Sequence, residues 1–146
     1  MNNLAKGVVA GLFATAVLSA LMVMKTMMGV MPQLDLIAMM SKMMGQPDTP
    51  MLGWATHLMI GAGYGVVFAL IGRSLPGGSF VVKGAGLGAI GWLAMMVMIM
   101  PMAGAGMFGM AMGVMAPMMT LVLHLIFGTV LGLIYGRLSA ASAAAD

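Results

Sequence analysis

Four long apolar stretches, separated by short polar or turn-rich segments, restrict the folds open to this chain more than any other feature. A helix needs about 20 apolar residues to cross the roughly 30 Å hydrocarbon core of a bilayer. Stretches of this length occupy residues 8–28, 51–71, 81–100 and 116–135. We therefore expect an all-α protein, an integral membrane four-helix bundle that forms a single transmembrane domain over residues 1–146.

The scarcity of charge excludes a soluble domain and a nucleic-acid-binding protein. Hydrophobic residues make up 62% of the sequence and charged residues only 6%, whereas about a quarter of an ordinary soluble domain is charged. The net charge of +3 is small, and the cations are too scattered to form the basic surface that nucleic acid requires. The absence of cysteine excludes disulfides and thiolate chemistry. The expected partner is the lipid bilayer.

Three short motifs occur twice in the same order and indicate an internal duplication. They are K-G-x-x-x-G at 6–11 and 83–88, H-L-x-x-G-x-x-x-G at 57–65 and 124–132, and Gly-Arg at 72–73 and 136–137. Repeat one therefore spans about 6–73 and repeat two about 83–137. Each repeat has two spans, so both insert the same way round. We expect parallel repeats, two helical hairpins related by an axis along the membrane normal.

Small residues spaced four apart mark the expected helix contacts. Lipid tails are as apolar as leucine side chains, so membrane helices associate mainly by close van der Waals fit. Such small-residue faces occur in all four spans, at Gly7 and Gly11, Gly61 and Gly65, Gly84 and Gly88, and Gly128 and Gly132. We expect these faces to pack helix against helix in a tight bundle.

The distribution of charge predicts the orientation in the membrane. Lys6, Arg73, Lys83 and Arg137 fall on one side, whereas Lys25 and Lys42 on the other side are offset by Asp35 and Asp48. The positive-inside rule places the first group and both termini in the cytoplasm. Residues 34–44, in the connection on the opposite side, should form a short interfacial helix. We expect Asp35 to cap its N-terminus, where the helix dipole favours an anion.

The order of these motifs resembles a known family. K-G-x-x-x-G is followed by Met31-Pro32-Gln33-Leu34-Asp35, then by Gly53-Trp54 and His57, and then by a second histidine-containing helix. This pattern is similar to that of an uncharacterised family of small four-helix bacterial membrane proteins, a domain of unknown function. The resemblance implies a multi-pass protein of the bacterial inner (cytoplasmic) membrane. It implies no activity.

Two histidines and a one-sided set of methionines are the candidate functional residues. His57 and His124 are the only ionisable side chains deep in the spans, and polar residues in a membrane usually face the bundle interior. Both share a helix face with glycines four and eight residues on. Of the 23 methionines, ten lie within 22–51 and eleven within 95–119. We expect the two imidazoles to meet in one methionine-bordered region.

Three interpretations of this region stay open. In the first, no cofactor is bound, the histidines bond protein groups across the bundle, and methionine fills irregular gaps. In the second, His57 and His124 ligate one b-type haem from facing helices. In the third they bind Cu(I), which favours imidazole and thioether ligands. The predicted copper ligands are His57, His124, Met59, Met107, Met110 and Met115, with Met39, Met40, Met43 and Met44 beside them.

An enzyme is not expected. The sequence has no Ser–His–Asp set, paired carboxylates, phosphate-binding loop or H-E-x-x-H motif. The connection over residues 101–113 is uncharged and rich in methionine and glycine, and an exposed apolar segment needs cover. The preferred hypothesis is a non-catalytic accessory or structural subunit that associates with other membrane protein subunits in a larger complex. The alternative is a haem- or copper-binding protein.

Overall fold

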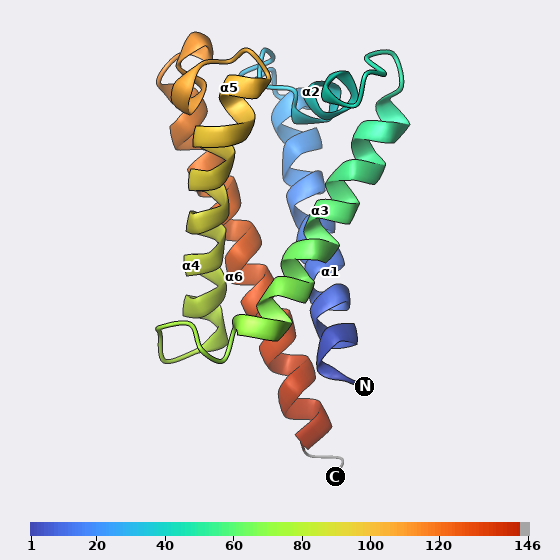
Figure 1. Cartoon of the computed structure of the whole chain (residues 1–146), viewed down its shortest axis with the longest axis vertical. Coiled ribbons are helices and arrows are strands. Elements are labelled where there is room, and N and C mark those ends of the chain that lie inside the picture. Colours follow the sequence, from blue (N-terminus) through green and yellow to red (C-terminus); the bar gives the residue numbers. More distant parts are fainter. Residues whose placement is uncertain (144–146) are drawn as a thin grey trace.

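The computed structural model describes residues 1–143, which form helices and loops without a strand. The elements are α1 (Asn3–Met27), α2 (Leu36–Met43), α3 (Pro50–Ile71), α4 (Phe80–Ala94), the π-helix η1 (Met95–Ile99), α5 (Met100–Met102), the 3-10 helix η2 (Met107–Met112) and α6 (Met115–Ala143) (Figure 1). The predicted all-α four-helix membrane bundle is confirmed.

Four helices are long and apolar enough to cross a membrane. They are Asn3–Met27, Pro50–Ile71, Phe80–Met102 and Met115–Ser142, and each coincides with one predicted span. The fourth helix continues past the predicted end at residue 135. The residues beyond that point include alanine, leucine and arginine, which favour helix. The helix therefore extends beyond its apolar stretch.

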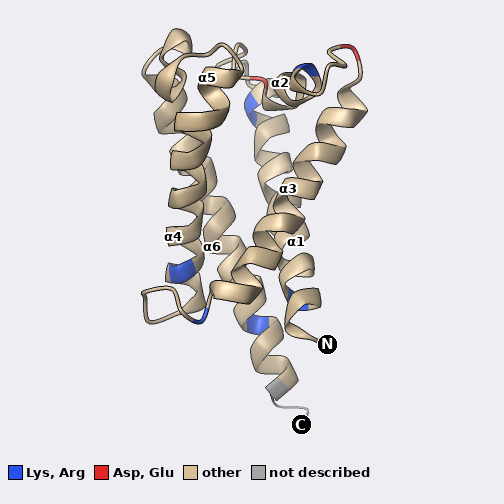
Figure 2. Ribbon diagram, in the orientation of Figure 1, with Lys and Arg blue, Asp and Glu red and all other residues tan. Residues whose placement is uncertain are grey.

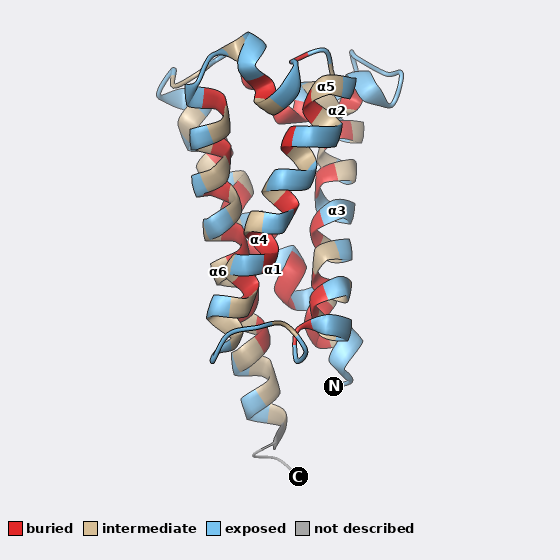
Figure 3. Cartoon of the chain, turned by 60° about the vertical axis from the view of Figure 1, so that its left-hand side comes forward, coloured by how far each residue is buried: buried red, intermediate tan, exposed pale blue. Residues whose placement is uncertain are grey.

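The four long helices pack as two hairpins. α1 packs along α3, α4 packs along α6, and the two hairpins meet mainly through α1 and α6. α3 and α4 lie outside this central pair and diverge toward the end that carries α2 and α5 (Figure 1). The buried residues line the seams between paired helices, and the opposite faces are exposed (Figure 3).

Glycines at the predicted positions allow the paired helices to touch backbone to backbone. A Cβ atom added to Gly65 would collide with the carbonyl oxygen of Gly7, and one added to Gly128 would collide with that of Gly84. Gly7 and Gly84 occupy matching positions in their motif, whereas Gly65 is the second and Gly128 the first glycine of the histidine motif. The predicted small-residue seams are therefore confirmed in both hairpins.

The two seams differ in register by one helical turn. A Cβ atom on Gly11 would meet the carbonyl oxygen of Gly61, whereas one on the matching Gly88 would meet that of His124. His124 corresponds to His57, one turn before Gly61. The second hairpin is thus shifted by four residues, or about 6 Å along the helix. Superposition of residues 6–73 on 83–137 as parallel repeats stays a prediction.

The end of the bundle where α1 begins is closed by an aromatic cluster. The rings of Phe68 and Tyr135, each eleven residues after its motif histidine, pack edge to face with their centroids 5.3 Å apart. Phe80 packs edge to face on both rings. Phe68 and Tyr135 are almost completely buried, so aromatic side chains fill this end of the bundle.

A π-helical turn interrupts the third span near its other end. The sequence predicts that this helix ends before Pro101, but it continues through η1 and α5 to Met102. Proline has no N–H, and its ring crowds the carbonyl four residues earlier. The chain accommodates this by widening locally, and the N–H of Met100 donates to the carbonyl of Met95, five residues back.

Charged residues gather at the two ends of the bundle (Figure 2). Lys6, Arg73, Lys83 and Arg137 lie at the end where α1 begins and α6 finishes, which we call the basic end. The opposite end, the Met-rich end, holds α2, α5 and η2. There Asp35 accepts a hydrogen bond from the backbone N–H of Ala38 at 2.9 Å, which confirms its capping role. Lys25 donates to the carbonyls of Val30, Met31 and Leu34 and so closes the turn before α2.

The glycine seam gives a stability prediction. Gly65→Ala should destabilise the protein by about 1–3 kcal/mol, because the added methyl group forces α3 away from the backbone of α1. Gly63→Ala is the matched control on the same helix, since its Cβ would have no atom within 4 Å. Denaturant or thermal unfolding in detergent should show a loss only for Gly65→Ala. Equal stability of the two variants would contradict this account of the seam.

Candidate functional site

A cavity of about 370 Å³ lies between the two hairpins, toward the Met-rich end. Its walls come from α1, α3, α4 with η1, and α6, and α2 covers it on the side of the Met-rich end. Both His57 and His124 line it. Six methionines also line it: Met39, Met40 and Met43 of α2, Met44 directly after α2, and Met95 and Met98 of η1. The structure thus brings the two predicted histidines together, with methionines around them. We call this space the central cavity.

His57 reaches the central cavity from α3. It lies two turns into the helix, about 10 Å from Pro50, and its side chain is only 7% exposed. Trp54, one turn earlier, packs edge to face on the imidazole with the ring centroids 6.2 Å apart. The Nε2 atom is buried and has no hydrogen-bond partner within residues 1–143. A buried polar atom without a partner is uncommon in folded proteins, and a partner molecule in the cavity is one explanation for it.

His124 reaches the same cavity from α6 but is held differently. Its Nδ1 lies 2.8 Å from the carbonyl oxygen of Thr120. A carbonyl can only accept, so Nδ1 carries the proton. In a neutral imidazole the other nitrogen, Nε2, then has a free lone pair. This is the only hydrogen bond of the ring to any residue that the structure describes. His124 therefore presents an acceptor, or a metal-binding nitrogen.

Thr120 ties His124 to the neighbouring helix. It is fully buried, and its hydroxyl donates to the carbonyl of Ala116 at 2.7 Å. The indole Nε1 of Trp92, on α4, donates to the carbonyl of Pro117 at 3.0 Å and to the Thr120 hydroxyl at 3.2 Å. Trp92 is thus a packing residue at mid-span, and it fixes the segment of α6 that carries His124.

Two aromatic residues and a glycine complete the wall farthest from α2. Tyr64 lies seven residues after His57, on the same face of α3, and its ring packs edge to face on Phe127 with centroids 5.7 Å apart. The Tyr64 hydroxyl touches α4 where Gly91 has no side chain, and a Cβ there would collide with it. Tyr64 was not predicted as a site residue, although its seven-residue spacing from His57 is a helical signal.

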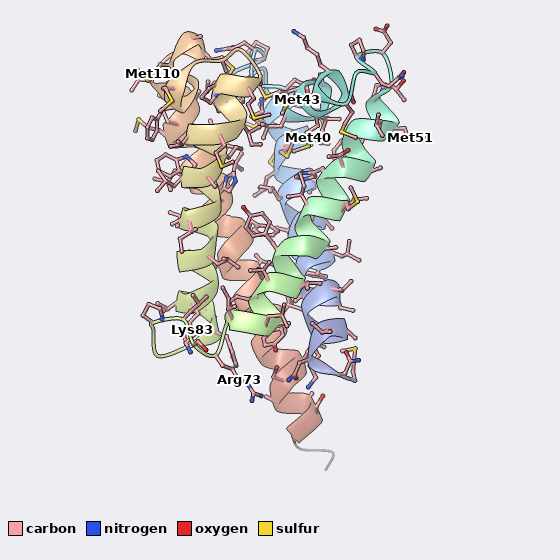
Figure 4. All side chains as sticks on the ribbon, viewed as in Figure 1. Met40, Met43, Met51, Arg73, Lys83 and Met110 are labelled. Carbon is pink, nitrogen blue, oxygen red and sulfur yellow. The ribbon has the colours of Figure 1, made fainter. Side chains whose placement is uncertain are left out.

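The methionines predicted as copper ligands do not line the central cavity. Met59 is 68% exposed, because two residues along a helix turn a side chain by about 200°, away from the face of His57. Met107, Met110 and Met115 are also exposed and belong to η2 and the start of α6, at the far side of the Met-rich end. Figure 4 shows Met110 there, apart from Met40 and Met43 on α2. The structure therefore does not bring these four methionines together with His57 and His124 at the central cavity.

The chemistry of the central cavity is neutral. No charged side chain lines it, and residues 1–143 contain no group of three or more His, Cys, Asp or Glu side chains placed to hold a metal ion. Two threonine hydroxyls in its wall are committed to their own helices. Thr15 donates to the carbonyl of Gly11 and Thr56 to that of Leu52. The side chains with a proton or a nitrogen lone pair left for a ligand are His57, His124 and Tyr64.

The two tryptophans give a matched test of the α4–α6 contact. Trp92→Phe should lower stability by about 1 kcal/mol more than Trp54→Phe, because only the Trp92 indole donates hydrogen bonds within the described chain. Both changes remove the same atoms. Unfolding curves in one detergent make the comparison, and equal losses would show that the indole hydrogen bonds add nothing.

Comparison with known sequences places the chain in a family. The sequence model of a family described as "Family of unknown function (DUF6789)" matches residues 1–146. No curated protein and no solved structure matches the sequence. The predicted membership in an uncharacterised family is thus confirmed, and the match covers the whole chain. The protein belongs to the DUF6789 family, whose function is not known.

Proposed function

We propose that this chain is a small, non-catalytic membrane protein that binds an uncharged, lipid-soluble molecule in its central cavity. The observation that carries the proposal is the cavity itself, about 370 Å³ in volume, with two histidines in an otherwise apolar wall. Binding sites for small molecules have volumes of about 300–1,000 Å³ and mostly apolar walls with a few polar groups. The uncharged wall favours an uncharged ligand, because an unpaired charge is costly in an apolar site.

The ligand enters from the bilayer and not from water. Ile60 on α3, and Ala94 on α4 and Met98 in η1, line the central cavity and are also exposed. They lie within two spanning helices that diverge from each other, so the mouth opens at the depth of the lipid tails. On the side toward water, α2 packs on α3 and covers the cavity.

The membrane and its partners complete the proposal. The cations at the basic end support an orientation with both termini in the cytoplasm of a bacterial cell and the Met-rich end outside the inner membrane. The exposed Met102, Met107 and Met110 in the uncharged connection support contact with other membrane protein subunits. The chain then acts as an accessory subunit that supplies or holds a lipid-soluble ligand for a larger complex.

Cavity filling tests the binding proposal. Ala94→Trp should fill the mouth and remove the ligand, because Ala94 lines the central cavity. Ala55→Trp is the control, since Ala55 is exposed on α3 and does not line the cavity. Protein purified from its native membrane in mild detergent is extracted with organic solvent, and the extract is analysed by mass spectrometry.

One lipid-soluble species, enriched over the bulk membrane, should accompany the wild type and the control but not Ala94→Trp. Enrichment that survives in a stably folded Ala94→Trp protein would place the ligand elsewhere. No enriched species in any of the three proteins would contradict the proposal.

Cu(I) is the second candidate ligand, and one observation favours it. His124 presents the lone pair of Nε2 in a cavity lined by six thioethers, and imidazole with thioether is a ligand set that suits Cu(I). A b-type haem fits less well, because its propionates would find no cation in the cavity wall. Stoichiometric copper in the purified protein would support the metal site, and a Soret band lost in His57→Phe would support haem.

The orientation makes a separate prediction. Reporter fusions after Asp146 and near Gln46 should report opposite sides of the membrane, with the first in the cytoplasm. Reversing the charge bias, by Arg73→Glu with Lys83→Glu, should reduce the fraction of correctly inserted protein, because these cations lie between the hairpins at the basic end. A cytoplasmic reporter at Gln46 would overturn the orientation.

A further inference from the structure

The two motif histidines are equivalent in sequence but differ in their hydrogen bonding. The ring of His124 is held by Nδ1, which donates to the Thr120 carbonyl at 2.8 Å. The structure gives the His57 ring no such bond within residues 1–143, and its Nε2 is buried and unpartnered. The hydrogen-bonding role of His124 is therefore fixed, whereas His57 can adopt either neutral tautomer.

The fixed role of His124 defines what a ligand must supply. Its Nε2 is an acceptor that faces an apolar space, and an acceptor left without a partner when a ligand fills that space weakens binding. The threonine hydroxyls in the wall have their protons committed to the carbonyls of Gly11 and Leu52. The donor for His124 therefore comes from a molecule in the cavity or from a movement of Tyr64 or His57.

The remaining polar groups of the wall favour a ligand that also accepts a hydrogen bond. The Tyr64 hydroxyl has a proton to donate, and His57 has one ring N–H in either tautomer. A hydroxyl group satisfies both sides of the site, because its proton goes to His124 and its oxygen accepts from Tyr64 or His57. A carbonyl or an ether can only accept and leaves His124 unpaired. An ionised head group is disfavoured by the uncharged wall.

We infer that the central cavity selects a lipid-soluble alcohol or phenol, whose O–H group donates to Nε2 of His124. This rests on the proposed function and names its ligand class. Two membrane sources share this chemistry: a ring phenol such as a quinol, and a long-chain isoprenoid alcohol. The lining of the cavity suits both, since Tyr64 and Phe127 offer aromatic surface to a ring and the six methionines adapt to an aliphatic chain.

Methyl ethers provide the matched probes. The full-length protein in lipid nanodiscs is titrated under anaerobic conditions with a decyl-substituted benzoquinol and its dimethyl ether, and with farnesol and farnesyl methyl ether. Binding is followed by tryptophan fluorescence, because Trp54 packs on His57. At least one alcohol should bind about tenfold more tightly than its ether, the loss expected when a buried acceptor is left unpaired. Preference for quinol, farnesol or both identifies the source.

Variants of His124 connect this selectivity to one atom. His124→Phe should bind alcohol and ether equally, because the ring remains but the acceptor is gone. His124→Gln should recover part of the selectivity, since its amide oxygen accepts. ¹⁵N spectra of the wild type should show Nε2 of His124 as an unprotonated nitrogen whose resonance moves when alcohol binds and not when ether binds. A purely structural histidine would show no such difference.

The outcomes separate the inference from the proposed function. If alcohols and ethers bind equally tightly to the wild type, the cavity binds lipid-soluble molecules without recognising a hydroxyl group. The inference is then wrong, while the proposed function stands. If neither alcohol nor ether binds, and no lipid-soluble species co-purifies with the wild type, both fail. Selectivity that persists in a folded His124→Phe protein would show that another group reads the hydroxyl, and it would also overturn the inference.

Discussion

The backbone contact between glycines is the interaction on which the rest of the structure depends. In lipid no hydrophobic effect holds helices together, so the bundle relies on how closely its helices fit. α1 and α3 meet at Gly7 and Gly65, and α4 and α6 meet at Gly84 and Gly128, where no side chain fits between the backbones. Such seams give each hairpin a rigid core. The large side chains therefore lie on the other faces of the helices and in the space between the hairpins.

The central cavity follows from this arrangement. The hairpins join through α1 and α6, while α3 and α4 stand apart at the Met-rich end. At the basic end the space is filled by Phe68, Tyr135 and Phe80. Toward the other end it stays open, bordered by methionines and by the two histidines. The two hairpins thus form a closed half and an open half, and their seams differ in register by one helical turn.

The sequence alone predicted the features that depend on spacing within one helix. The four spans, the glycine seams, the capping role of Asp35 and the shared region of His57 and His124 follow from apolar length, four-residue spacing and motif repetition. Family membership was also predicted, from the motif order. Features that depend on how separate helices are placed could not be read this way. The methionines of η2 and the start of α6 are near His124 in sequence, but the loop carries them to the far side of the Met-rich end.

The positions of Tyr64 and of the η1 methionines could have been predicted from helical spacing, although they were not. Tyr64 shares the face of His57, and Gly91, Met95 and Met98 share a face at helical spacing, so periodicity could have placed them beside the histidine. The π-helical turn depends on Pro101 remaining inside the helix instead of ending it, which is decided by the packing of the whole span. The tautomer of His124 depends on a single carbonyl, that of Thr120, and only a structure reveals it.

The most direct test of the central claim is a crystal structure of the protein grown from a lipidic phase containing native-membrane lipid. The account predicts that α3 and α4 remain apart at the Met-rich end, with density for a non-protein molecule between them that reaches Nε2 of His124. A structure in which α3 packs against α4, with both imidazoles bonded to protein groups and the space closed, would contradict it.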